Sequence, residues 1–127
     1  MASAVLAGAI FLAWFLATAV LSGYTRLQLQ DGATGRILLS TFLQDDAGAT
    51  LTWHNSLFDL DVIENFVARA GVLVQTGVTF ADPRGLPPMV IPPEEIDDYY
   101  HTGGPFTTTG LQRRFTRIVY RISEIGN

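Results

Sequence analysis

The sequence predicts a mainly β protein, with one N-terminal transmembrane α-helix followed by a small β-sandwich or open β-barrel domain. Residues 1–25 carry no charge, and 4–21 are almost wholly apolar. At ~1.5 Å rise per residue, a helix of roughly 20 residues matches the hydrocarbon thickness of a bilayer. The rest of the chain has short runs of alternating polar and apolar residues, which are typical of β-strands.

The apolar segment 1–25 is interpreted as a retained transmembrane anchor. Residues 17–19 resemble a signal-peptidase site, but a signal peptide normally begins with Lys or Arg and has a shorter apolar core. Gly8 and the alanines near every fourth position allow close helix packing in lipid. Together with Phe11 and Trp14, they predict that the anchor packs against a larger membrane protein.

Composition limits the class of protein. A net charge of −4 and a pI near 4.9 argue against nucleic-acid binding, because phosphate recognition needs a basic surface. The absence of Cys excludes disulfides and Cys-based metal sites. Residues 26–127, about 100 in number, suffice for one small domain.

The domain is expected to be a run of short strands. The segment 59–70 has both helical and strand-like periodicity, and its strand-like neighbours favour a strand. A Pro-rich loop with an acidic cluster is expected at 81–105. The expected strands cover 24–29, 37–43, 49–54, 72–80, 106–109 and 116–123.

No catalytic motif is present, so we expect no enzyme activity, no cofactor and no metal. His54 and Glu64 are a candidate structural or ligand pair if their strands are neighbours. The cluster of Arg113, Arg114, Arg117 and Arg121 is predicted either to pair with the acidic loop or to contact a partner.

The sequence resembles a small domain-of-unknown-function family whose genes commonly lie beside TAXI-type tripartite ATP-independent periplasmic (TRAP) transporters. The similar segments include LTWHNS at 51–56 and VIENF at 62–66. Further similarity lies in GVLV at 71–74 with GLP at 85–87, and in GGPF at 103–106 with GLQRRF at 110–115. The resemblance implies an extracytoplasmic domain with a transporter accessory role and no enzyme activity.

The orientation of the domain has two conflicting indications. Arg26 and Arg36, the first positive charges, follow the predicted anchor and favour a cytoplasmic domain. The family resemblance implies a periplasmic domain. Because one nearby Arg is a small bias, we follow the resemblance and expect a single-pass protein of the inner membrane.

The resulting hypothesis is a non-catalytic, single-span accessory subunit of a TAXI-type TRAP transporter complex. Its expected partners are a larger integral membrane permease, the lipid bilayer and a periplasmic substrate-binding protein. Arg113, Arg114, Arg117 and the loop 83–93 are the expected contact residues. A pilin-like filament or envelope subunit is the alternative. A third hypothesis is a membrane-tethered ligand or metal-binding module built on His54 and Glu64.

Overall fold

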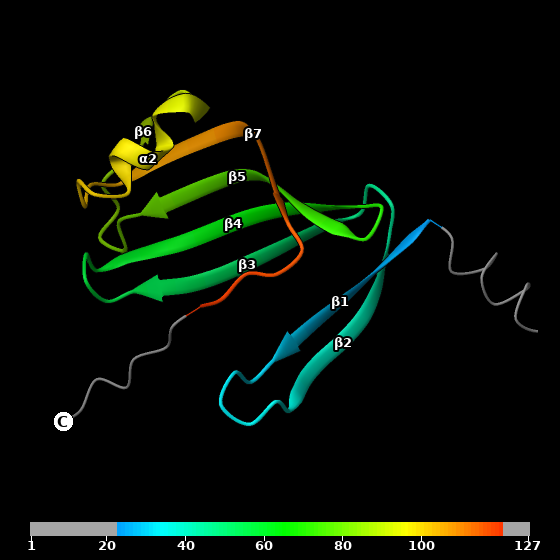
Figure 1. Cartoon of the computed structure of the whole chain (residues 1–127). Helices are drawn as coiled ribbons and strands as arrows, with labels where there is room; N and C mark the ends of the chain where they lie inside the picture. The colour runs from blue at the N-terminus through cyan, green and yellow to red at the C-terminus, as the bar shows by residue number, and fades with distance from the viewer. Residues whose placement is uncertain (1–22, 121–127) are drawn as a thin grey trace, which may run out of the picture.

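The computed structural model describes residues 23–120, which form two β-sheets (Figure 1). A two-stranded sheet contains β1 (Tyr24–Gln30) and β2 (Ile37–Gln44). The five-stranded sheet has the order β3-β4-β5-β7-β6, and only the β6–β7 pair is parallel. Its strands are β3 (Gly48–Asn55), β4 (Leu60–Arg69), β5 (Val72–Ala81), β6 (Met89–Val90) and β7 (Phe106–Phe115). A helical turn, η1 (Pro93–Glu95) and α2 (Ile96–Tyr99), separates β6 from β7.

The core lies on one face of the five-stranded sheet, which we call the inner face. Leu60 and Val62 alternate with more exposed residues along β4, so that one side of the strand is buried. Ile96 of α2 packs into this core, and Phe80 stacks on Phe106 with ring centroids 4.7 Å apart. The helical turn therefore covers the β6–β7 end of the inner face (Figure 1).

The connection between β4 and β5 is a two-residue turn at Ala70 and Gly71. Both residues have positive φ, +48° and +82°, as a type I′ hairpin turn requires. Gly71 adopts this conformation without steric cost, whereas Ala70 must bring its Cβ close to a carbonyl oxygen. Ala70 is therefore a point of local backbone strain.

The predicted transmembrane helix is contradicted. No helix among residues 23–120 is long and apolar enough to cross a membrane. Tyr24 and Thr25, assigned to the predicted anchor, instead pair with β2 in extended conformation. The single-pass inner-membrane localisation depended on that helix and is withdrawn with it. Residues 1–22, including Gly8, Phe11 and Trp14, lie outside the described residues.

The expected strands at 24–29, 37–43, 49–54 and 72–80 are confirmed, and 59–70 is a strand rather than a helix. The predicted sandwich or open barrel is wrong, because β1 and β2 form a separate hairpin whose apolar side chains remain half exposed. The strand expected to start at 116 is also wrong within 116–120. The ladder with β5 instead continues to Phe115, and the chain then leaves the sheet.

Replacing Ala70 by Asn should stabilise the protein by about 0.5–1 kcal/mol, because Asn tolerates the left-handed conformation and Asn-Gly is favoured in type I′ turns. Urea unfolding followed by circular dichroism measures the change. Ala70→Val is the matched control and should destabilise, since a β-branched residue fits this conformation poorly. Equal stabilities of the two variants would contradict the assignment of strain to Ala70.

Candidate functional site

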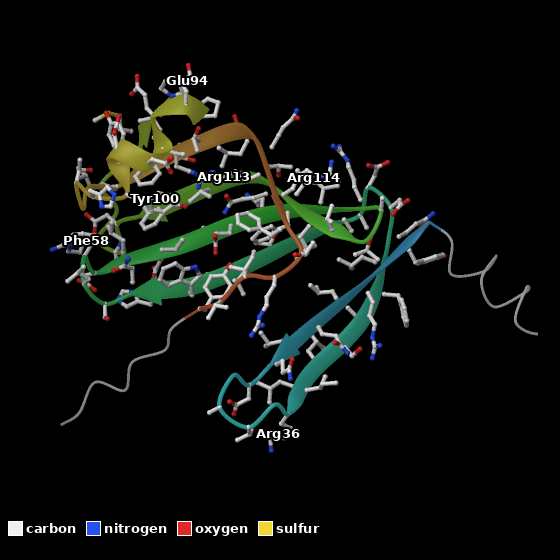
Figure 2. All side chains as sticks on the ribbon, in the orientation of Figure 1. Arg36, Phe58, Glu94, Tyr100, Arg113 and Arg114 are labelled. Carbon is white, nitrogen blue, oxygen red and sulfur yellow. The ribbon has the colours of Figure 1, made fainter. Side chains whose placement is uncertain are left out.

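The β1–β2 hairpin is the first candidate site. Its turn is held by Asp31, whose Oδ1 accepts hydrogen bonds from the amides of Ala33 (2.8 Å) and Thr34 (3.3 Å). These bonds lower the pKa of the Asp31 carboxyl, because they favour its charged form. Arg36 marks the turn at the free end of the hairpin (Figure 2). Figure 1 shows the hairpin extending away from the five-stranded sheet.

The free end of the hairpin carries an apolar surface, the hairpin patch. Its side chains are each between 50% and 53% exposed. The residues of the hairpin patch are Leu29, Ile37, Leu38 and Leu39. Leu29 lies opposite Leu39 on one face of the ladder, and Gln28 lies opposite Ser40 on the other face, where Phe42 is also exposed. A two-stranded hairpin is at best marginally stable in water, so this apolar surface suits a partner.

The base of the hairpin is fixed to the β4–β5 turn by hydrogen bonds. The amide of Gly71 donates to Thr25 Oγ1 (3.1 Å), and the amide of Ala70 donates to Asp45 Oδ1 (3.3 Å). Arg69 Nε pairs with Asp46 Oδ1 at 3.0 Å. The hairpin patch is thus held by its base while its free end remains available.

The structure does not bring His54 and Glu64 together. His54 lies opposite Asp61, on the outer face of β3 and β4, and its Nδ1 is 2.9 Å from Asp61 Oδ1. Its Nε2 is 3.1 Å from Asp59 Oδ1. Asp61 raises the pKa of His54 by hydrogen bonding and by charge, and Asp59 adds to the rise. Glu64 lies three residues from Asp61 and points to the inner face.

A second candidate site surrounds Glu64, which is only 7% exposed. Trp53 Nε1 donates to Glu64 Oε2 (3.0 Å), and so does the hydroxyl of Tyr120 (2.7 Å). Gln75 Nε2 donates to Glu64 Oε1 (2.8 Å). We call these four residues the Glu64 cluster. Three donors to one buried carboxylate offset much of the cost of removing its charge from water.

The phenols near Glu64 remain protonated over the ordinary pH range. Burial and the hydrogen bond to Glu64 raise the pKa of Tyr120 far above its usual value. Burial is also the main cause of the raised pKa of Tyr100, and the charge of Glu64 adds to it. Tyr120 therefore acts as a hydrogen-bond donor to Glu64 rather than as an acid–base group.

The three arginines predicted as contacts have different surroundings. Arg113 pairs through Nη2 with Asp97 Oδ1 of α2, which confirms for this residue the predicted pairing with the acidic loop. Figure 2 shows Arg113 near Tyr100, beneath the helical turn. Arg114 lines a hollow of about 90 Å³ together with Arg69. Arg117 is exposed beyond the end of β7.

The Pro-rich loop expected as a contact lines an open groove of about 480 Å³. Leu86, Met89, Tyr99 and Pro105 are among the lining residues, and Leu86 and Met89 are well exposed. Among residues 23–120, no three His, Cys, Asp or Glu side chains are arranged to hold a metal ion.

Sequence reasoning selected Glu64 but assigned no role to Trp53, Gln75 or Tyr120. One available signal was the alternation along β4, where Leu60, Val62, Phe66 and Ala68 define the buried register. Glu64 occupies an inward position of that series, and a carboxylate there must be satisfied by donors. No pattern in the sequence identifies Tyr120, which reaches Glu64 from 56 residues away.

Comparisons with known proteins found no match: no family model, no curated protein and no solved structure is similar to the chain. The resemblance of the segments 51–56 and 62–66 to the TRAP-associated family therefore stays a prediction. The same holds for the partners and for the lack of enzyme activity that this resemblance implies.

Glu64→Gln should cost less than about 1 kcal/mol, whereas Glu64→Leu should cost about 3 kcal/mol, because Leu leaves buried donors unpaired. The amide introduced by Glu64→Gln can place its carbonyl toward Trp53 and Tyr120. Gln75 can then turn its own amide and accept from the introduced NH₂ group through Oε1, an atom with no protein partner among the described residues. Urea unfolding measures both costs, and similar costs for the two variants would contradict this account.

His54 should titrate above its ordinary pKa of 6.5, and Asp61→Asn should move its pKa back toward that value, because Asp61 is the main cause of the rise. The protonated form is favoured in the folded state. Its contribution to stability is therefore full below pH 6.5 and lost as the pH rises through the raised pKa. NMR titration of the imidazole checks this, with His101→Gln to assign the signals. An unchanged His54 pKa in Asp61→Asn would refute the assignment.

Proposed function

We propose that this chain is a non-catalytic binding protein that docks a larger protein partner through the hairpin patch. The observation that carries the proposal is the exposure of Leu29, Ile37, Leu38 and Leu39 at the free end of a two-stranded sheet. Such a hairpin gains stability when its apolar residues are covered. A partner that covers them gains binding free energy from the same burial.

The proposed partner is the substrate-binding protein of a TAXI-type TRAP transporter, with the chain supporting its docking or the assembly of the transporter. Support for this choice comes from the sequence resemblance over 27–123, whose similar segments lie within 51–115. The net charge of −4 disfavours an anionic lipid surface as the main partner, since such surfaces attract basic segments.

Docking should weaken when the hairpin patch is made polar. Changing Leu29 and Leu39 together to Ser removes two half-exposed leucines, at roughly 1 kcal/mol each, and should weaken binding about 30-fold. Isothermal titration of the purified chain with the TAXI-type substrate-binding protein measures the affinity. Gln28→Ser is the matched control on the opposite face and should bind as the original chain does.

Three outcomes would overturn the proposal. The first is no binding to the substrate-binding protein together with no permease co-purifying with the tagged chain. The second is binding that the two Ser substitutions leave unchanged. The third is flotation of the chain with phospholipid vesicles but no protein binding. Self-association lost in the double variant would instead support the filament-subunit alternative.

A further inference from the structure

Residues 116–120 form a segment that we call the C-terminal strap. Figure 1 shows the chain leaving β7 and crossing the sheet toward β3. No backbone hydrogen bond joins the strap to another described residue. A side-chain hydrogen bond holds the strap: the hydroxyl of Tyr120 donates to Glu64 Oε2 at 2.7 Å. The Tyr120 ring also meets Trp53 edge-on, with centroids 6.1 Å apart.

A strap held by side chains alone opens at lower cost than a strand of the sheet, because no ladder of backbone bonds must break. Opening, however, removes one of three donors from the Glu64 carboxylate and uncovers Trp53. The emptied site consists of a carboxylate acceptor beside an indole ring. Its best occupant is a phenol on an extended chain, since that group restores both the hydrogen bond and the ring contact.

We propose that this site is also filled in trans, by the strap of a second copy of the chain. The strap is the one segment whose fit to Glu64 and Trp53 is visible among the described residues. A second copy carries the same Tyr120, and its own Glu64 and Trp53 form the same site for the strap of the first copy. The result is a two-fold dimer in which each copy gives its strap and receives its partner's.

The hinge for this exchange lies just after Phe115, which is the last residue of β7 and pairs with Leu73. Up to this point the backbone is fixed by the sheet, and beyond it residues 116–120 make no backbone bonds to the rest of the described chain. Exchange therefore breaks and re-forms the same side-chain contacts. Since a short tether gives the strap an effective concentration of about 1 mM at its own site, the dimer forms at high protein concentration.

A peptide with the sequence of residues 115–120, FTRIVY, tests whether the site accepts a strap in trans. Its fluorescein-labelled form should bind the Tyr120→Phe chain, whose own strap has lost its hydrogen bond. It should bind about tenfold more weakly to the Tyr24→Phe chain, a matched control that keeps its strap closed. A second peptide ending in Phe should also bind about tenfold more weakly. Absent binding, or equal binding of both peptides, would overturn the proposal.

Strap opening can be measured independently by trypsin, because Arg117 lies within the strap and is exposed. Cleavage after Arg117 should be about tenfold faster in Tyr120→Phe than in Tyr24→Phe, since the former loses a hydrogen bond to a carboxylate. Equal cleavage rates in the two variants would show that Tyr120 does not hold the strap, and the proposal would fail.

Sedimentation equilibrium of the full chain at concentrations up to about 1 mM tests the dimer itself. We expect a monomer–dimer equilibrium that is lost in Glu64→Leu, or in Trp53→Phe should Glu64→Leu fail to fold. The Leu29 and Leu39 double Ser variant should retain it, which separates strap exchange from association through the hairpin patch. A chain that stays monomeric, or a dimer lost only in the hairpin variant, contradicts strap exchange.

Discussion

The buried carboxylate of Glu64 is the interaction on which the inner face depends. It lies on β4 and receives donors from β3, from β5 and from the C-terminal strap. A carboxylate this deeply buried is tolerated only when its oxygens are paired, so its presence requires Trp53, Gln75 and Tyr120 to remain in place. One polar group thereby fixes the relative positions of elements that apolar packing alone would leave free to shift.

Much of the fold follows from local sequence patterns. The alternation of polar and apolar residues places β1 to β5 nearly correctly, because a strand with one buried face imposes a period of two. The segment 59–70 is a strand for the same reason, and its β-branched residues support it. The C-terminal strand was misplaced, since Gly110 interrupts the pattern of β7 and Arg113 and Arg114 weaken it, although the two arginines pair with β5.

The candidate sites were less accessible to sequence reasoning. Register decides that His54 faces Asp61 while Glu64 faces the core, and register depends on the four-residue connection between β3 and β4 rather than on either strand. The contact between Glu64 and Tyr120 is a long-range one that no local pattern encodes. The predicted sandwich would bury the apolar residues of the hairpin, and hydrophobicity alone does not tell such a buried face from a docking face.

The inner face and the hairpin patch differ in whether the chain itself covers them. The inner face is closed by the chain itself, since the helical turn and the strap cover it and Glu64 is satisfied internally. The hairpin patch is half exposed although its base is fixed by hydrogen bonds to the β4–β5 turn. A fixed base with an apolar free end lowers the entropy lost on binding, because the strands are already ordered before a partner arrives. The hairpin is thus the better-prepared surface for a foreign protein, and the strap site for a segment that already belongs to the chain.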